Sequence, residues 1–358
     1  MLNFTVGPVM SDEDVLETAH QSTPYFRTPE FSALMKENER MFLDLLHAPA
    51  GSRAVFLTAS GTGAMESCVM NLLRDEDRVI VINGGSFGQR FVDLCTLHER
   101  RFTEVRCRFG SALRRGQLAG LEDHTVLLIN MHETSSGVLY DMPMVADFCR
   151  ENGIFLIVDA ISAFLAEELD MEALGAGAVM TGSQKALAVQ PGVSLLALSP
   201  EAVHRAENNP ERCMYLSLRQ ALKNAERGQT PFTPAVTTLL QIHTRLTGIA
   251  ARGGADRERA DIAARAGAFR AGIADLPFTT VPESPSNAVT TLHPLYVPAS
   301  QIVRVLKDEY GIWACPNGGA LADEVFRIGH IGHIRPEDMQ ALLGALHDMN
   351  DRGLLGQP

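Results

Sequence analysis

Short apolar runs alternate with amphipathic segments along the first two thirds of the chain. The apolar runs are rich in aliphatic and β-branched residues and are bounded by Gly, Asn, Asp or Ser, as is typical of buried strands. They cover residues 54–58, 78–82, 125–130, 154–159, 178–181 and 193–199. Amphipathic segments such as 64–73, 87–100 and 142–152 separate them and predict helices. This alternation predicts an α/β fold with a mostly parallel central sheet covered by helices.

The pattern changes toward the C-terminal end. Residues 234–274 predict a long helical stretch, with a bend or break near the pair Gly253 and Gly254. A turn-rich segment, VPESPSN, follows. Beyond it we expect strands at 288–293 and 325–329, and helices at 298–310 and 336–350. We therefore expect a large domain over residues 15–255 and a small C-terminal α+β domain over 256–358, joined by an N-terminal segment over 1–14.

Composition narrows the classes of function. The 31 basic and 43 acidic residues give a net charge of −12, which argues against a general binder of nucleic acids or anionic membranes. No apolar stretch approaches the roughly 20 residues of a membrane span. The N-terminus lacks the basic start of a signal peptide, and the six cysteines form neither CxxC pairs nor zinc-site spacings. We expect a cytoplasmic protein with reduced, mostly buried thiols and no nucleic-acid or membrane partner.

Only four of the basic residues are lysines, and Lys185 differs from the others in its surroundings. It is the only charged residue among the 28 between Glu172 and Glu201, and it lies in a polar turn between two apolar strands. Burial there would lower its pKa and make the amine a nucleophile. The alternative is a lysine whose stem lies on apolar surface while its charge reaches water.

Two other features complete a possible cofactor site. Asp159 ends an apolar strand, where open α/β sheets bind ligands, although it could instead cap the segment that follows. The small-residue turn in LTASGTGAMES, residues 57–67, would suit a phosphate at a helix N-terminus. This turn is neither a P-loop nor a GxGxxG motif. A phosphate turn, a strand-end carboxylate and an isolated lysine together are what pyridoxal 5′-phosphate requires.

In the order of these motifs the chain resembles the fold-type I pyridoxal-phosphate-dependent enzymes. It is most similar to the class V aminotransferases of the alanine/serine–glyoxylate type. The resemblance runs from NFTVGPV near the N-terminus to FRIGHIG near the C-terminus. It implies a transaminase that moves an amino group from a small amino acid to a 2-oxo acid such as glyoxylate or pyruvate, through a Schiff base at Lys185. It also implies a homodimer with active sites at the interface.

The resemblance further implies roles for single residues. TGSQK would make Lys185 the Schiff-base lysine and bring Gln184 to the cofactor phosphate. By its likeness to the family's phosphate turn, SGTGAME would bind the cofactor phosphate through Ser60, Gly61 and Thr62. By its likeness to the strand-end motif, VDAIS would bring Asp159 to the pyridine nitrogen and pack Ile161 under the ring.

Four more motifs carry implied roles. NGGSFGQR would stack Phe87 on the free face of the ring, and HETSSGV would bring Ser135 near the ring hydroxyl and the substrate. FRIGHIG would bind the substrate carboxylate through Arg327, whose planar guanidinium suits that task. PFTPAV would reach the phosphate of the neighbouring subunit through Thr233, although Thr230 stands where relatives often have an aromatic residue. The VGPV loop, residues 6–9, would lie over the substrate pocket.

Structural interpretations stand beside these roles. Phe87 could be an ordinary core residue, Ser135 a turn-former and Arg327 one partner of a structural ion pair. For His132 we favour a structural role, because the lysine amine already supplies a base. The pair His330 and His333 has HxxH spacing, but no further ligand is apparent, so we expect no metal site.

Other functions on the same scaffold stay open. An aminoethylphosphonate–pyruvate transaminase fits several motifs, but SQK favours the glyoxylate type, because phosphonate relatives tend to have Asn before the lysine. A cysteine desulfurase would usually have His in place of Gln184 and a late, mobile cysteine, for which Cys315 is the candidate. A lyase or an epimerase is compatible with the same cofactor. A nucleotide-binding or regulatory α/β module would lack the yellow colour of bound cofactor.

Overall fold

The computed structural model describes residues 1–356. Seven strands form the central sheet in the order β2-β10-β9-β8-β5-β3-β4. All neighbouring strands are parallel except that β10 runs antiparallel to both β9 and β2. The strand bounds are β2 Arg53–Leu57, β3 Val79–Asn83, β4 Phe102–Arg106, β5 Val126–Asn130, β8 Phe155–Asp159, β9 Ala176–Gly182 and β10 Ser194–Leu198.

The six strands expected for this sheet are all present, and the mostly parallel α/β architecture is confirmed. The seventh strand, β4, was missed. Its sequence, FTEVR, holds two charged residues, and its side chains are mostly exposed or half-buried. An edge strand needs no continuous apolar run, because only part of it is covered.

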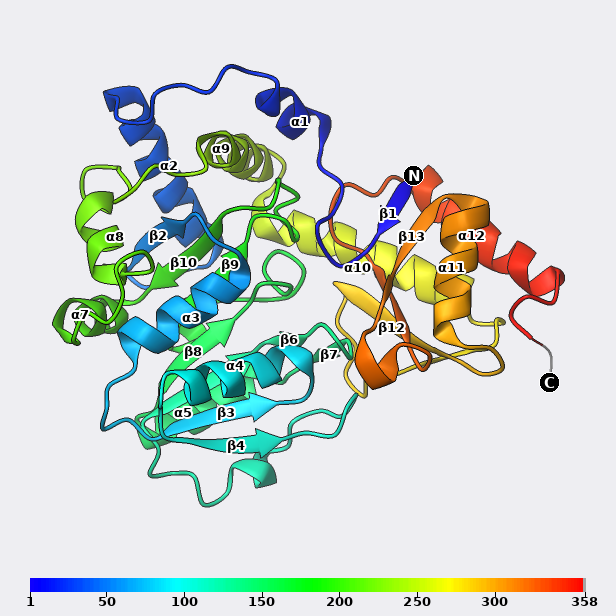
Figure 1. The fold of residues 1–358 in the computed structure, drawn as a ribbon, viewed down its shortest axis with the longest axis horizontal. Helices are drawn as coiled ribbons and strands as arrows, with labels where there is room; N and C mark the ends of the chain where they lie inside the picture. Colours follow the sequence, from blue (N-terminus) through cyan, green and yellow to red (C-terminus); the bar gives the residue numbers. More distant parts are fainter. Residues whose placement is uncertain (357–358) are drawn as a thin grey trace.

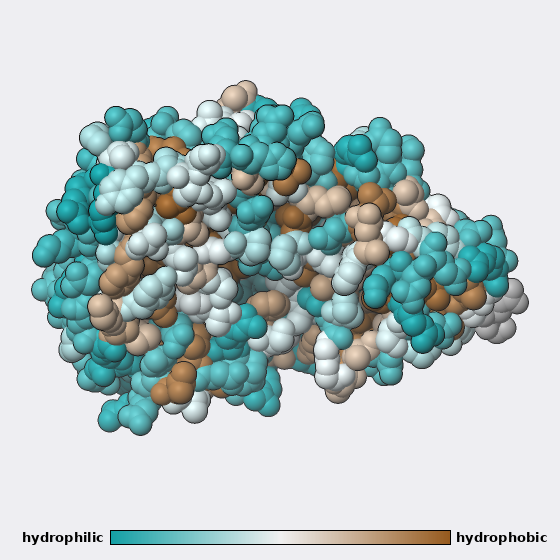
Figure 2. Space-filling model, turned by 45° about the horizontal axis from the view of Figure 1, so that its top comes forward, coloured by the Kyte–Doolittle hydropathy of each residue, from teal (hydrophilic) through white to brown (hydrophobic). Residues whose placement is uncertain are grey.

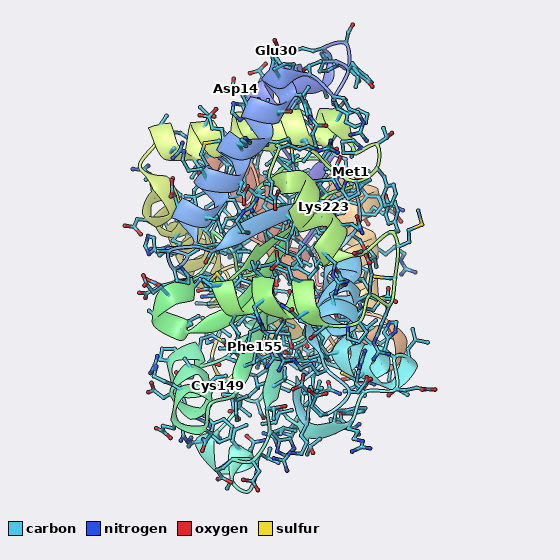
Figure 3. All side chains as sticks on the ribbon, turned by 90° about the vertical axis from the view of Figure 1, so that its left-hand side faces the viewer. Met1, Asp14, Glu30, Cys149, Phe155 and Lys223 are labelled. Carbon is cyan, nitrogen blue, oxygen red and sulfur yellow. The ribbon has the colours of Figure 1, made fainter. Side chains whose placement is uncertain are left out.

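Helices cover both faces of the central sheet (Figure 1). Along β3, Ile80 and Ile82 pack in one apolar cluster while Val79 and Val81 pack in another, because successive side chains of a strand point to opposite faces. Figure 3 labels one residue on a helix of each face, Cys149 on α5 and Lys223 on α8. One face carries α2 Pro29–Leu45, α5 Met142–Asn152 and α9 Val236–Ala251; the other carries α3 Gly61–Leu72, α4 Ser86–Leu97, α7 Pro200–Asn208 and α8 Leu218–Ala225. The short helices α1 Glu13–Ala19 and α6 Met171–Leu174 complete this part.

A second sheet of five strands, in the order β1-β13-β14-β12-β11, forms a smaller lobe. The start of the chain contributes to it, because β1 pairs in parallel with β13. The apolar core of this lobe includes residues of α10, α11 and α12. The bounds are β1 Leu2–Phe4, β11 Phe278–Thr280, β12 Val289–Pro294, β13 Ile312–Pro316, β14 Phe326–Gly329, α10 Gly254–Gly272, α11 Ala299–Tyr310 and α12 Pro336–Asp351.

The long helical stretch expected over residues 234–274 breaks at the pair Gly253 and Gly254, as predicted. Helix α9 ends at Ala251 and α10 begins at Gly254, with Gly253 at a φ of +108° that favours glycine. Helix α10 then runs from the larger lobe to the smaller one (Figure 1). The expected domain boundary at 255/256 falls in the first turn of α10, and the division into two domains stays a prediction.

The strands of the small lobe were only partly foreseen. β12 and β14 and helices α11 and α12 lie within about two residues of their expected positions. Three strands, β1, β11 and β13, were missed. The first and second have only three residues, and β13, IWACP, is apolar but its side chains are only partly buried. Hydrophilic residues cover most of the outer edges of both lobes (Figure 2). Within residues 1–356, no helix has the length and apolar character that crossing a membrane requires.

Candidate active site

Three strands of the central sheet end beside one another and bring polar residues together. Asp159 is the last residue of β8 and stands opposite Asn130, the last residue of β5. Strand β9 ends at Gly182, so Lys185 lies in the turn directly after it. The carboxyl ends of parallel strands form the ligand-binding edge of open α/β sheets. The candidate carboxylate and lysine therefore lie at the edge where a ligand is expected.

The Asp159 carboxyl group is buried, and its Oδ1 accepts a hydrogen bond of 2.8 Å from the Ile161 backbone N–H. Burial raises the pKa of Asp159 to about 7, and the negative charge of Glu133 adds to this rise. The Ile161 N–H and the positive charge of Lys185 oppose it. A positively charged ligand group beside Asp159 would restore its ionised form, so the site favours a cation there.

Lys185 is buried, with 8% of the residue exposed, and does not extend into solvent. Its Nζ donates a hydrogen bond of 2.5 Å to the Val6 carbonyl oxygen. Burial lowers the pKa of Lys185 to about 8, and the positive charge of Arg327 acts in the same direction. The neutral, nucleophilic form of this amine is therefore more abundant near neutral pH than that of an ordinary lysine.

The turn between β2 and α3 holds the three residues expected at the phosphate. Ser60 is the exposed N-cap of α3, and its hydroxyl makes no hydrogen bond to the helix. Gly61 lies against Ile161, because an added Cβ would lie 2.4 Å from Ile161 Cδ1. Arg90 donates a hydrogen bond of 2.9 Å to Thr62 Oγ1. A free hydroxyl and a cation beside a helix N-terminus suit a phosphate.

Phe87 lies half-buried in the first turn of α4, and this turn is tied to the segment that carries Ser135. The Ser86 N–H donates to Ser135 Oγ at 3.1 Å, and the Gly88 N–H donates to Glu133 Oε2 at 2.9 Å. The Ser135 hydroxyl in turn donates to Glu133 Oε1. The residues expected at the ring face and the ring hydroxyl therefore belong to one hydrogen-bonded group.

Arg327, on β14, is buried and held by backbone oxygens. Its Nη1 donates to the Thr134 carbonyl at 3.0 Å and its Nη2 donates to the Pro316 carbonyl at 2.8 Å. Each of these nitrogens carries a second N–H, so the guanidinium keeps donors for an anion. In the part of the chain that the structure describes, Arg327 forms no salt bridge with a carboxylate. The alternative of a structural ion pair therefore does not describe this arginine.

Two expected cofactor residues are not brought into this group. The Gln184 side chain folds back on Gly182, where an added Cβ would lie 2.8 Å from Gln184 Oε1. Thr233 is exposed in the loop before α9. Two residues later, the Ala235 N–H donates to Thr58 Oγ1 at 3.0 Å, so this loop runs beside the candidate phosphate turn of the same chain. The expected contact of Thr233 with a second subunit stays a prediction.

Glu133 and Arg90 were not foreseen as site residues, and Cys315 was considered only as the cysteine of a desulfurase. Glu133 is fully buried between α4 and Ser135, and Arg90 lies 4.9 Å from the centre of the Phe87 ring. Arg90 follows Phe87 by three residues on a helix, a spacing that could have identified the pair. Cys315 stands opposite Arg327 in the β13–β14 ladder. No local pattern marks that contact, because β13 is paired through residues distant in sequence.

The histidines considered earlier make ordinary structural contacts. His132 Nδ1 lies 3.0 Å from Ser162 Oγ, and burial, with the positive charge of Lys185, lowers the pKa of His132 to about 3. His330 is buried and bonded through Nε2 to Thr290 Oγ1 at 2.8 Å. His333 is bonded to Asp12 instead. Within residues 1–356, no three His, Cys, Asp or Glu side chains gather in a way that could hold a metal ion.

The donor set of this site fits pyridoxal phosphate. A buried amine with a lowered pKa can react with an aldehyde, and a buried carboxyl group with a raised pKa can pair with a protonated ring nitrogen. The α3 N-terminus, with its free Ser60 hydroxyl and nearby Arg90, can hold a phosphate. A lysine, an acid and a phosphate turn are the three elements that the cofactor needs.

Comparisons with known proteins agree with this chemistry. Residues 13–319 match the family model "Aminotransferase class-V". A soluble hydrogenase 42 kDa subunit from Anabaena cylindrica is 30% identical, with 95% of this chain and 90% of the relative covered. A serine–glyoxylate aminotransferase from Arabidopsis thaliana is 28% identical, with 96% and 88% covered. The crystal structure of a subgroup IV aspartate aminotransferase from Thermus thermophilus is 26% identical and superposes with a TM-score of 0.92, over 98% of this chain and 99% of that one.

Proposed function

The chain belongs to the class-V aminotransferase family of pyridoxal-phosphate enzymes, and we propose that it moves the amino group of a small, alanine- or serine-like amino acid to glyoxylate or pyruvate. The observation that carries this proposal is the buried Arg327 guanidinium at the same site as Lys185 and Asp159. Asn317, directly after β13, donates to the Ser135 carbonyl at 3.0 Å, so the two segments whose Thr134 and Pro316 carbonyls hold the guanidinium are also joined to each other. An enclosed carboxylate site favours a compact donor.

Each candidate residue has a role that its surroundings support. When bound, pyridoxal phosphate supplies an aldehyde that condenses with amines and a ring that accepts electrons. Arg327 would bind the donor carboxylate through its free N–H groups and fix the donor's orientation. Lys185 Nζ, in its neutral form, would take the proton from the donor Cα. Asp159 would hold the ring nitrogen protonated, since its buried carboxylate gains from a neighbouring positive charge.

The remaining contacts would fix the cofactor in place. Ser60, Gly61 and Thr62 would bind the phosphate, with Arg90 adding a positive charge at Thr62. Phe87 and Ile161 would lie on opposite faces of the ring. In this arrangement Ser135 would meet the ring hydroxyl, and Gln184 would have to turn away from Gly182 to reach the phosphate.

We further propose a homodimer that works in the cytoplasm, with Thr233 reaching the partner's phosphate site. The six cysteines are free, and four of them are buried, which is common in a reducing compartment. Tyr215 stacks on Phe232 with ring centres 5.4 Å apart, and Tyr215 and the neighbouring Met214 are largely exposed. Exposed aromatic residues beside the phosphate turn suit an interface. Sedimentation of the wild type and of Tyr215→Ser tests this, and a monomeric wild type would refute it.

A screen of the donor half-reaction tests the proposed substrate class. Holoenzyme would be mixed separately with alanine, serine, aspartate and 2-aminoethylphosphonate, and the visible band of the bound cofactor would be followed. We expect alanine or serine to remove the band. Arg327→Lys should raise the concentration of donor required by about tenfold or more, because a point charge replaces a bidentate partner, and Lys185→Ala should not react. Loss of the band with aminoethylphosphonate alone would instead identify the phosphonate-type transaminase.

Analysis of the products separates the other functions of this scaffold. A transaminase gives a 2-oxo acid in an amount equal to the amino group transferred. A desulfurase would release sulfur from cysteine in a reaction lost in Cys315→Ser, whereas an epimerase would return the amino acid with inverted configuration. A lyase would break a carbon–carbon or carbon–heteroatom bond of the donor. Any of these as the dominant product would contradict the proposed transfer.

A further inference from the structure

Glu133 is a carboxylate with no exposed surface that lies between the α4 turn and the end of β5. Its Oε1 accepts hydrogen bonds from the Ser135 N–H at 3.1 Å, the Ser135 hydroxyl, and the Phe87 N–H at 3.4 Å. Its Oε2 accepts from the Gly88 N–H at 2.9 Å and from Asn130 Nδ2 at 3.1 Å. Four residues thus direct five donor groups at this carboxylate.

This donor set selects the ionised carboxylate. A carboxylate accepts at about four lone-pair positions and donates nothing, whereas a glutamine side chain would turn an NH₂ group toward other donors. In the described residues no lysine, arginine or histidine forms a salt bridge with Glu133. Its negative charge is therefore stabilised by backbone and amide dipoles, including the positive end of α4, and is not cancelled by a cation.

The carboxylate determines how two site segments meet. The turn at the start of α4 carries Phe87. The connection between the short antiparallel strands β6 His132–Glu133 and β7 Val138–Leu139 carries Ser135. Gly85 permits their close approach, because an added Cβ there would lie 2.7 Å from Glu133 Cδ and 2.2 Å from Ser135 Oγ. One further hydrogen bond, from the Ser86 N–H to Ser135 Oγ, joins the two segments directly, and Glu133 also binds that hydroxyl. Moving Glu133 would therefore shift the Phe87 ring and the Ser135 hydroxyl together.

We propose that Glu133 is a positioning residue of the cofactor site, whose ionised carboxylate fixes Phe87 and Ser135 and supplies negative charge next to Asp159. The proposal rests on the proposed function, since Phe87 and Ser135 are expected to contact the cofactor. Glu133 acts through these neighbours and touches no reacting atom. Its role is specific to a carboxylate, because an apolar side chain of similar size would leave the buried donors of both segments without an acceptor.

The charges around Asp159 support this role. Glu133 from β6 adds to the rise in the pKa of Asp159 that burial causes, whereas Lys185 and Arg90 oppose it. Glu133 also opposes the lowering of the Arg327 pKa that burial causes. Its charge thus favours protons and cations where the ring nitrogen and the guanidinium are expected.

Hydrogen exchange of the apoprotein tests the positioning without cofactor. In Glu133→Gln, the backbone N–H groups of residues 86–88 and Ser135 should exchange at least about tenfold faster. One of the two acceptor oxygens for the Phe87, Gly88 and Ser135 N–H groups becomes an NH₂ group, and the Ser135 hydroxyl that accepts from Ser86 loses its acceptor. Glu133→Asp should show the same increase, since its shorter side chain loses reach. Glu167→Gln is the matched control: Glu167 is also buried and accepts from Ser286, but it lies outside this group. Its exchange at residues 86–88 should equal that of the wild type.

A spectroscopic titration of the holoenzyme tests the charge. The pH midpoint of the visible cofactor band should fall in Glu133→Gln, because a negative charge that favours the protonated form is removed. In Glu133→Asp the charge is kept, so the midpoint should stay closer to that of the wild type even though affinity for the cofactor falls about tenfold. This variant also decides the question if Glu133→Gln does not fold.

The outcomes separate the two proposals. Faster exchange together with the shifted midpoint supports the role of Glu133. Unchanged exchange at residues 86–88, or an equal midpoint in the wild type and Glu133→Gln, overturns it. If the wild type itself forms no visible band with pyridoxal phosphate, the proposed function fails, while the exchange result still reports on the geometry of Glu133.

Discussion

Lys185 Nζ and the Val6 carbonyl oxygen are joined by a hydrogen bond of 2.5 Å, although 179 positions separate the two residues in the sequence. The contact brings the N-terminal loop over the turn that follows β9. Gly7, the next residue, has a φ of +121° and packs against the lysine stem. The first residues of the chain therefore take part in holding the candidate nucleophile.

Gly7→Ala should slow attachment of the cofactor. An added Cβ would lie 2.7 Å from Lys185 Cδ and would also force alanine into a backbone conformation that it rarely adopts. We expect the rate of borohydride-stable attachment of pyridoxal phosphate to fall about tenfold or more. Gly120→Ala is the control, because Gly120 has a φ of +84° with open space around it. Equal attachment rates in the two variants would show that the Gly7 contact is unimportant.

The reactivity of Lys185 should increase around pH 8. Burial lowers the pKa of Lys185 from 10.5 to about 8, so its neutral amine becomes abundant at a lower pH than that of an ordinary lysine. Reductive methylation of the apoprotein, followed by peptide mass spectrometry, would give the labelling rate against pH. The exposed Lys223, marked in Figure 3, serves as the internal comparison. If the labelling rates of both lysines had the same pH midpoint, Lys185 would not be desolvated.

Asp159→Asn should stabilise the apoprotein at high pH while weakening the cofactor site. The folded-state pKa of Asp159 is raised by burial, so its contribution to stability is greatest below about pH 4 and is lost as the pH rises to about 7. At pH 8 the variant should therefore be more stable than the wild type, on the order of 1–3 kcal/mol, with little difference at pH 4. Urea unfolding at both pH values checks this.

The same Asp159→Asn variant should bind pyridoxal phosphate at least about tenfold more weakly, because the charged partner of the ring nitrogen is lost. A loss of stability at pH 8 would contradict the buried position of the carboxylate. Unchanged cofactor affinity would instead contradict its proposed role at the ring.

Alkylation of Cys315 should block donor binding. Cys315 and Arg327 are directly opposed across β13 and β14, and side chains of such pairs lie about 5 Å apart on one face of the sheet. Iodoacetamide should therefore slow loss of the cofactor band on addition of alanine, and Cys315→Ser should resist this effect. Cys213, which is also partly exposed, provides the control through Cys213→Ser. Equal sensitivity of the wild type and Cys315→Ser would place the affected thiol elsewhere.

The local pattern of apolar residues was sufficient to predict most strands of the central sheet. Buried parallel strands such as β5 and β8 are continuous apolar runs, and these runs give nearly the correct bounds. The edge strand β4 and the three-residue strand β1 were missed for the opposite reason. Their stability comes from neighbours distant in sequence, so no local apolar run is required.

The sequence also identified much of the candidate site. The isolation of Lys185 and Asp159 within apolar sequence singled them out as candidates for a cofactor site, with a solvent-exposed lysine left open. The structure shows both residues buried at the same edge of the sheet. The sequence did not reveal Glu133, because a glutamate in a polar motif gives no local sign that five donors will surround it. Nor did it show that Cys315 lies beside Arg327.

The sequence by itself determined six of the seven strands of the central sheet and which residue types are present for cofactor chemistry, because hydrophobic periodicity and motif spacing are local properties. Only the tertiary structure decided that the Val6 carbonyl meets Lys185, that one carboxylate ties Phe87 to Ser135, and that burial moves the pKa values of Asp159 and Lys185 toward neutrality. These properties depend on desolvation and on contacts between distant segments, which exist only after the sheets and helices have packed.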